Sequence, residues 1–109
     1  MIDTGASKSV IDAAYANIHF PNAFRILTDH QTTGLGAQIP NAGFVRLRNI
    51  RIGKHHLKPI SFALLDLSVV NQAYAEARLD PVIAILGGDV LRKYGMIINY
   101  QDATLSFQL

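Results

Sequence analysis

Apolar and polar residues alternate most clearly over two segments in the middle of the chain, residues 44–52 and 57–65. Such alternation is typical of strands with one buried face, and Ile52-Gly53-Lys54-His55 between them suits a hairpin turn. The alternation slips phase near Asn49, which predicts a bulge. Pro59 cannot donate a ladder hydrogen bond, so the second strand is expected at a sheet edge or in an irregular position.

Shorter elements are expected on both sides of this hairpin. The extended segments are residues 7–11, 25–28, 32–39, 82–86, 96–100 and 104–109. Three brief helices are expected between them, namely 13–18 after a capping Asp12, 69–79 after a capping Ser68, and 90–94 between a capping Asp89 and Gly95. In the second helix, apolar residues 69, 70, 73, 74 and 77 fall on one stripe. The predicted fold class is mainly β with short helices.

Composition limits the class of protein. The 109 residues are 50% hydrophobic and 17% charged, which suits one folded domain and excludes a disordered chain. The longest apolar runs are far shorter than the ~20 residues that a bilayer requires, so no membrane span is predicted in this chain. The absence of cysteine excludes disulfides, a thiol nucleophile and cysteine-ligated zinc.

The charged residues indicate neither nucleic acid nor metal. The net charge is only +2, although five of the ten Lys and Arg residues lie between positions 46 and 58. No aromatic side chains interleave them for stacking on bases, so a solvated hairpin face is favoured over a nucleic-acid stripe. Histidines 19, 30, 55 and 56 could suggest a metal. His55 and His56 are adjacent, would point to opposite faces of a strand and have no carboxylate at ligand spacing nearby, so surface turns are favoured over a metal site. No metal or other cofactor is predicted.

Candidate chemistry begins at Asp3-Thr4-Gly5-Ala6-Ser7, which alone suits an ordinary turn. A second motif, Ile85-Leu86-Gly87, runs into the last predicted helix. Together the two motifs resemble the retropepsin-like (retroviral-type, clan AA) aspartic proteases, most closely the bacterial single-domain type. Thr33-Gly34-Leu35-Gly36-Ala37 is similar to the glycine-rich flap of that family, and residues 85–100 align without a gap on the helix and strand that end a retroviral protease.

The resemblance implies a fold and an activity. The fold is a retropepsin-like half-barrel, and the activity is hydrolysis of peptide bonds within a polypeptide by water held between the Asp3 carboxylates of a homodimer, without a cofactor. Thr4 and Gly5 complete the catalytic triplet, with the Thr4 hydroxyl bonding across the two-fold axis. The resemblance further implies that the Gly5 amide and the Ser7 hydroxyl hold Asp3. Its remaining site residues are the supports Ala6, Ser7, Ile85, Leu86 and Gly87, and the flap residues Gly34, Leu35, Gly36 and Ala37.

Several alternatives stay open at this point. A catalytically silent retropepsin fold could bind peptide or dimerise, and an unrelated β-rich binding domain could carry both motifs as turns. Ile85 is favoured as a core residue over a substrate subsite, and Asp89 as a cap over a second catalytic carboxylate. The hairpin that precedes the catalytic loop in the family is missing, so residues 1–109 are expected to be an N-terminally truncated domain. A signal or anchor upstream would point to the periplasm or a membrane.

Overall fold

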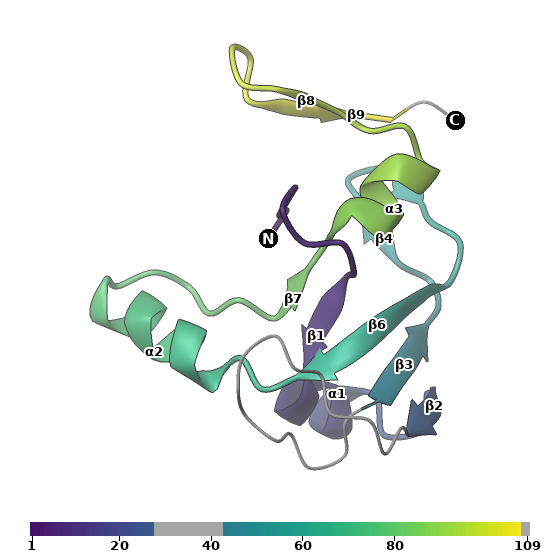
Figure 1. Ribbon diagram of the computed structural model, residues 1–109, viewed down its shortest axis with the longest axis vertical. Helices are drawn as coiled ribbons and strands as arrows, with labels where there is room; N and C mark the ends of the chain where they lie inside the picture. The colour runs from purple at the N-terminus through teal and green to yellow at the C-terminus, as the bar shows by residue number, and fades with distance from the viewer. Residues whose placement is uncertain (28–42, 108–109) are drawn as a thin grey trace.

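The computed structural model describes residues 1–27 and 43–107, and strands outweigh helices in it, at 34% against 24% (Figure 1). The predicted mainly β class is therefore confirmed. In chain order the elements are β1 (Val10–Asp12), α1 (Ala13–His19), β2 (Phe24–Leu27), β3 (Gly43–Leu47), β4 (Arg51–Ile52), β5 (His55–His56), β6 (Ile60–Leu65), α2 (Ser68–Glu76), β7 (Ala84–Ile85), α3 (Gly88–Lys93), β8 (Ile97–Asn99) and β9 (Thr104–Ser106).

Five of the strands form one sheet, in the order β2-β3-β6-β1-β7. Strands β1 and β6 are parallel and the other neighbours are antiparallel. Val10 of β1 lies between Ala63 of β6 and Ile85 of β7. The sheet is open within the described residues, as expected of a half-barrel. Strand β1 thus carries the chain from the Asp-Thr-Gly loop directly into the sheet.

The central hairpin is confirmed, but the position expected from Pro59 is wrong. Strand β3 pairs with β6, and β4 with β5 beyond it. Asn49, where the alternation slips phase, has a φ of 60° and separates β3 from β4, while Gly53 has a φ of 59° in the turn. Strand β6 lies inside the sheet, between β3 and β1. Pro59 precedes β6 instead of lying within it, so the ladder loses no hydrogen bond.

The core lies between this sheet and the short helices α1 and α3. Its buried members are Ile11, Ala16, Val45, Leu47, Leu57, Ile60, Phe62, Leu64, Val90 and Tyr94. Helix α1 begins as predicted, because the Asp12 carboxylate accepts the Tyr15 amide at 3.1 Å. The other oxygen of Asp12 accepts the Leu67 amide at 3.0 Å, which ties the end of β6 to the start of α1.

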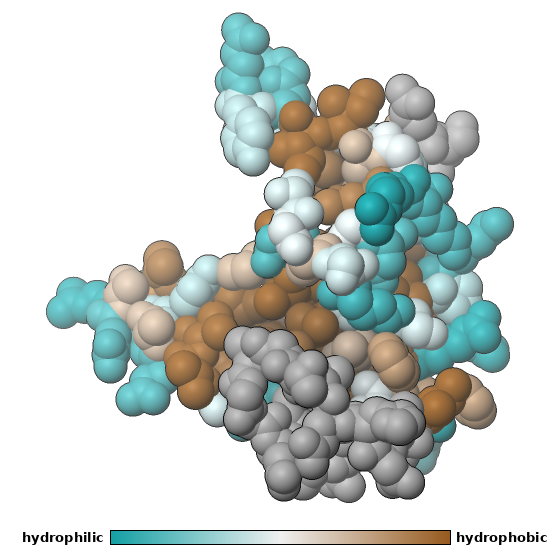
Figure 2. Space-filling view, viewed as in Figure 1, coloured by the Kyte–Doolittle hydropathy of each residue, from teal (hydrophilic) through white to brown (hydrophobic). Residues whose placement is uncertain are grey.

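Helix α2 is present, but the cap predicted at Ser68 is wrong, and the apolar stripe along the helix is not buried. Leu67 is the N-cap, and the Ser68 amide donates to the Asp66 carboxylate at 2.9 Å. No residue of α2 is buried, because the helix projects from the body of the molecule beside an apolar surface (Figures 1 and 2). Asn71 attaches it to the chain leading to β7, through bonds of 2.6 and 3.0 Å to the amide and carbonyl of Val82. The strand expected over 82–86 is reduced to β7.

The last two strands form a hairpin that stands away from the main sheet (Figure 1). Gly95 ends α3 with a φ of 53°, as its predicted C′ position requires. Strand β8 then pairs with β9, so a strand is present in the segment 104–109 that was predicted to be extended, over Thr104–Ser106. None of the helices that the structure describes has the length and apolar character needed to cross a membrane.

Candidate active site

The two sequence motifs lie side by side, although some eighty residues separate them in the chain. The Asp3 amide donates to the Leu86 carbonyl at 2.9 Å, and the Leu86 amide donates to the Met1 carbonyl at 2.8 Å. Two residues further on, the Gly88 amide donates to the Ala6 carbonyl at 2.6 Å. The Asp-Thr-Gly loop is therefore fastened at both ends to the segment that enters α3.

Gly87 is required by this close contact. A Cβ atom at this position would lie 2.7 Å from the Ala6 carbonyl oxygen and 3.0 Å from the carbonyl group of Lys8. The backbone of Gly87 has a φ of −103°, which any residue can adopt. The glycine is therefore needed for close backbone approach and not for an unusual backbone angle.

The carboxylate of Asp3 is exposed and held by its own loop. Its Oδ1 atom accepts the Gly5 amide at 2.9 Å, which is the contact that the resemblance implied. Ser7 is exposed, and the hydrogen bonds of the described residues include none between Ser7 and Asp3. The Thr4 side chain is also exposed, so its bond to a second chain stays a prediction.

A cavity of about 440 Å³ opens between this loop and the β8–β9 hairpin. Its lining residues are Ile2, Asp3, Thr4, Ile98, Asn99, Tyr100, Ala103, Thr104 and Leu105. Among these described lining residues, Asp3 is the sole carboxylate. The site of one chain therefore offers a single carboxylate, surrounded mainly by apolar and hydroxyl-bearing side chains.

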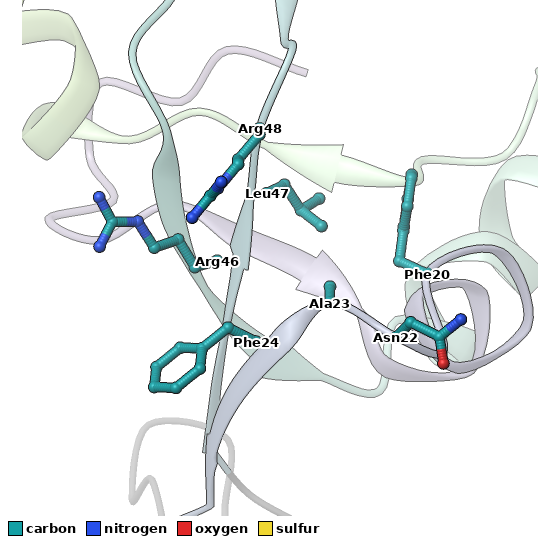
Figure 3. Close-up of a pocket in the computed structure, with 7 residues that line it drawn as sticks. All are labelled: Phe20, Asn22, Ala23, Phe24, Arg46, Leu47 and Arg48. Atoms are coloured by element: carbon teal, nitrogen blue, oxygen red, sulfur yellow. The ribbon is translucent and has the colours of Figure 1, made fainter.

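A larger cavity of about 580 Å³ lies elsewhere, beside β2 and β3. Figure 3 shows its lining residues, which are Phe20, Asn22, Ala23, Phe24, Arg46, Leu47 and Arg48. An arginine guanidinium stays protonated in proteins and cannot act as a base, and none of these side chains is a nucleophile. The smaller cavity at Asp3 is therefore the better candidate for hydrolytic chemistry, despite its size.

Two residues at the base of the loop were not predicted to belong to the site. Ser9 has no exposed surface, and its hydroxyl accepts the Gly87 amide at 2.9 Å. The hydroxyl of Ser9 donates to Asp89 Oδ1 at 2.7 Å, and its amide donates to the same oxygen at 3.0 Å. The capping role predicted for Asp89 is wrong, because Gly87 is the N-cap and Asp89 lies in the first turn of α3.

The sequence carries one signal for Ser9. In an extended segment, residues two apart share a face, and Ser9 precedes the buried Ile11 by two positions. A hydroxyl on a buried face requires a hydrogen-bond partner, so this position pointed to a polar contact inside the fold. Its partner Asp89, far along the chain, could not be identified from spacing.

The other predicted site residues lie in different places: one is on a strand, one contacts the core, one is at the surface, and four are outside the described residues. Ile85 of β7 is half-buried and paired with Val10 of β1, and Leu86 packs against the core. The predicted flap residues 34–37 lie outside the described residues. Ser7 remains at the surface, between the Asp-Thr-Gly triplet and the buried Ser9.

Two of the three histidines that the structure describes make ring-packing contacts. The His19 ring stacks on Tyr15 at 4.1 Å between centroids, and the His55 ring lies 4.5 Å from that of Phe107. Within residues 1–27 and 43–107, no three His, Asp or Glu side chains gather as a metal site requires.

Comparison with known proteins adds one match. A family model described as aspartyl protease matches residues 1–90. The match spans the Asp-Thr-Gly loop, the five-stranded sheet and the segment Ile85-Leu86-Gly87, and ends early in α3. No curated protein matches the chain.

Proposed function

The chain belongs to the retropepsin-like aspartyl protease family, and on this premise we propose that it is an endopeptidase whose catalytic group is the Asp3 carboxylate. The observation that carries the proposal is the state of that side chain. It is exposed in a cavity and held by the Gly5 amide, while the backbone of its loop is fastened to Leu86 and Gly88. A fixed, accessible carboxylate is what general acid–base catalysis requires.

We propose that the second catalytic carboxylate is the Asp3 of an identical chain. Hydrolysis without a metal needs one group that takes a proton from water and another that gives a proton to the carbonyl oxygen. Two carboxylates in close contact hold one proton between them and can do both. Because Asp3 is the sole carboxylate among the described lining residues, a two-fold axis beside the loop supplies the partner.

Exposed apolar side chains at the start of the chain and on β8 support such a homodimer. Met1, Ile2 and Ile97 are 49%, 44% and 50% exposed, and a second chain would remove this apolar surface from water. Across the same axis the Thr4 hydroxyls would join the two loops. We propose that residues 1–109 act as one domain and that residues 34–37 form the flap over the bound polypeptide.

In the proposed reaction the ionised carboxylate takes a proton from water, and the water oxygen forms a bond to the peptide carbonyl carbon. The protonated carboxylate gives its proton to the carbonyl oxygen, which produces a neutral tetrahedral intermediate. The C–N bond then breaks, the hydroxyl proton returns to one carboxylate, and the amine nitrogen takes a proton from the other. Every proton is accounted for by water and the two Asp3 side chains.

The test is cleavage of an unstructured protein by the wild type and by Asp3→Asn. We expect Asp3→Asn to abolish cleavage. Mixing the two at equal concentration should lower the activity of a fixed amount of wild type to about half, because random pairing places half of its chains in mixed dimers. Unchanged activity in the mixture would show that one chain holds a complete site.

The alternative is a silent module that binds peptide without cutting it. One observation favours it, namely the single carboxylate in the cavity of one chain, since a chain that does not pair productively has no dyad. Peptide binding without cleavage at any pH from about 3 to 7, which brackets the pKa values typical of such dyads, would favour the silent module over the enzyme.

A further inference from the structure

We propose that Ser9 and Asp89 are positioning residues, which keep the Asp-Thr-Gly loop in its shape only while Asp89 is ionised. The proposal rests on the proposed function for its catalytic meaning, because it concerns the support of the Asp3 loop. Its physical content, a polar contact behind the loop that opens in acid, can be tested without any cleavage assay. We call this contact the Ser9–Asp89 clasp.

The clasp is a continuous chain of hydrogen bonds between three parts of the fold. The Gly87 amide donates to the Ser9 hydroxyl at 2.9 Å, and that hydroxyl donates to Asp89 Oδ1 at 2.7 Å. The Ser9 amide donates to the same carboxylate oxygen at 3.0 Å. The hydroxyl therefore uses its proton on Asp89 and a lone pair on Gly87, so its orientation is fixed.

The hydrogen bonds of the Ser9–Asp89 clasp lie next to the backbone bonds that hold the Asp-Thr-Gly loop. Gly87 stands between Leu86, whose carbonyl accepts the Asp3 amide, and Gly88, whose amide donates to the Ala6 carbonyl. A displacement of Gly87 therefore reaches both ends of the loop at once. Since Ser9 is the single buried polar residue among those described, losing its partner leaves a polar group without compensation away from water.

The charged groups around Asp89 favour its ionised form. Lys8, on the loop side, has its Nζ atom 3.5 Å from Oδ2 and lies 5.4 Å above the Phe44 ring of β3. On α3 itself, the Arg92 guanidinium lies beside Gly88, at the N-terminal end of the helix. Both of these side chains are positively charged. Protonation of Asp89 removes its attraction to Lys8 and weakens both bonds from Ser9.

The pKa of Asp89 agrees with this arrangement. Partial burial opposes ionisation, but the hydrogen bonds from the Ser9 hydroxyl and amide, the hydrogen bond from the Val90 amide and the charge of Lys8 outweigh it, so the pKa lies below the ordinary 3.8. A carboxylate with a lowered folded-state pKa contributes its full stabilisation above 3.8 and loses it as the pH falls through the lower folded value. The clasp is therefore expected to stay closed in mild acid and to open only in stronger acid.

The experiment follows two backbone amides of the full chain by nuclear magnetic resonance between about pH 2 and 6, a range that spans ordinary aspartate titration. Hydrogen-exchange protection of Gly87 reports the clasp, and the amide chemical shift of Gly5, which donates to Asp3, reports the loop. In the wild type we expect Gly87 protection to fall about tenfold or more as Asp89 protonates, since bonds to charged groups are the stronger class. The Gly5 shift should move over the same pH range.

Three variants separate the causes. Asp89→Asn keeps an acceptor oxygen but no charge, so Gly87 protection should be lower than in the wild type above pH 4 or so and should show no titration step. Ser9→Ala removes the acceptor of the Gly87 amide and should lower its protection at every pH. Asp66→Asn is the matched control, because Asp66 is an exposed aspartate whose pKa is lowered by the Ser68 amide and hydroxyl, away from the loop. It should reproduce the wild-type curve.

The outcomes are distinct. If Gly87 titrates as before in Asp89→Asn, the clasp is overturned. If Gly87 responds but the Gly5 shift does not, the positioning role is overturned and Asp89 only supports local structure. Where cleavage is measured, Asp89→Asn should lower kcat several-fold with little change in KM. If the protein cleaves nothing while both amides behave as expected, the proposed function is contradicted and the proposal of the clasp is supported. The titration of the wild type tests the clasp even if a variant does not fold.

Discussion

Replacing Gly87 with alanine tests whether close backbone contact determines the site. The new Cβ would lie 2.7 Å from the Ala6 carbonyl oxygen and 3.0 Å from the carbonyl carbon and oxygen of Lys8, all of them backbone atoms. Real Cβ atoms essentially never come closer than 3.0 Å to a neighbour, so part of the loop must move. Any such movement strains two bonds, Gly88 amide to Ala6 carbonyl and Gly87 amide to Ser9 hydroxyl.

The magnitude follows from these two effects. An extra methyl in a well-packed region costs about 1–3 kcal/mol, and weakening a buried hydrogen bond adds about 1 kcal/mol. We therefore expect Gly87→Ala to lower the free energy of unfolding by about 2–4 kcal/mol. At roughly 4–8 °C per kcal/mol for a domain near this size, Tm should fall by about 8–32 °C.

Gly88→Ala is the matched control, one residue away. Its Cβ would lie 3.3 Å from the end of the flexible Arg92 side chain and 3.5 Å from the Ala6 carbonyl oxygen. The guanidinium can move aside, and alanine is the better helix former at the first residue of α3, so the change should stay within about 1 kcal/mol. Urea and thermal unfolding of both variants measure the difference. Equal stability of the two variants would refute the argument from close contact.

Two further predictions concern contacts outside the site. Asn71→Ala removes both bonds to Val82 and should raise the amide exchange rates of α2 selectively, because this helix has no buried residue to hold it; uniform change across the chain would contradict this. Tyr94→Phe leaves the Lys58 amide without the hydroxyl that accepts it at 2.7 Å, and should lower the free energy of unfolding by about 1–2 kcal/mol in urea titration. No loss would mean that water replaces the hydroxyl.

The parts of the fold that follow from local pattern were predictable from the sequence. Alternation of apolar residues gave the central hairpin, a capping aspartate gave the start of α1, and a glycine gave the end of α3. Each of these depends on residues within a few positions of one another. The same local rule failed for Ser68 and Asp89, because other backbone and side-chain groups compete for a polar side chain near a helix start.

The order of the strands in the sheet and the contact of Ser9 with Asp89 behind the loop depend on residues far apart in the sequence, which no local pattern contains. Pro59 suggested an edge strand, but the sequence around it does not show that β6 begins only at the next residue. The apolar stripe of α2 was predictable from its spacing, but its lack of burial was not, because burial depends on whether distant parts of the chain cover the helix. Likewise, Ser9 has the buried position of a strand residue, but its partner lies eighty residues away.

The structure divides the site into an exposed carboxylate and a buried support, and this division has a consequence for mutagenesis. Asp3 contributes one hydrogen bond from Gly5 at the surface, and asparagine can accept the same bond, so Asp3→Asn should remove the chemistry with almost no loss of stability. Changes at Gly87 or Ser9 alter buried backbone contacts and should reduce stability and activity together. Loss of activity without loss of stability is therefore the signature of a catalytic group here. Joint loss marks a residue that acts by holding the loop.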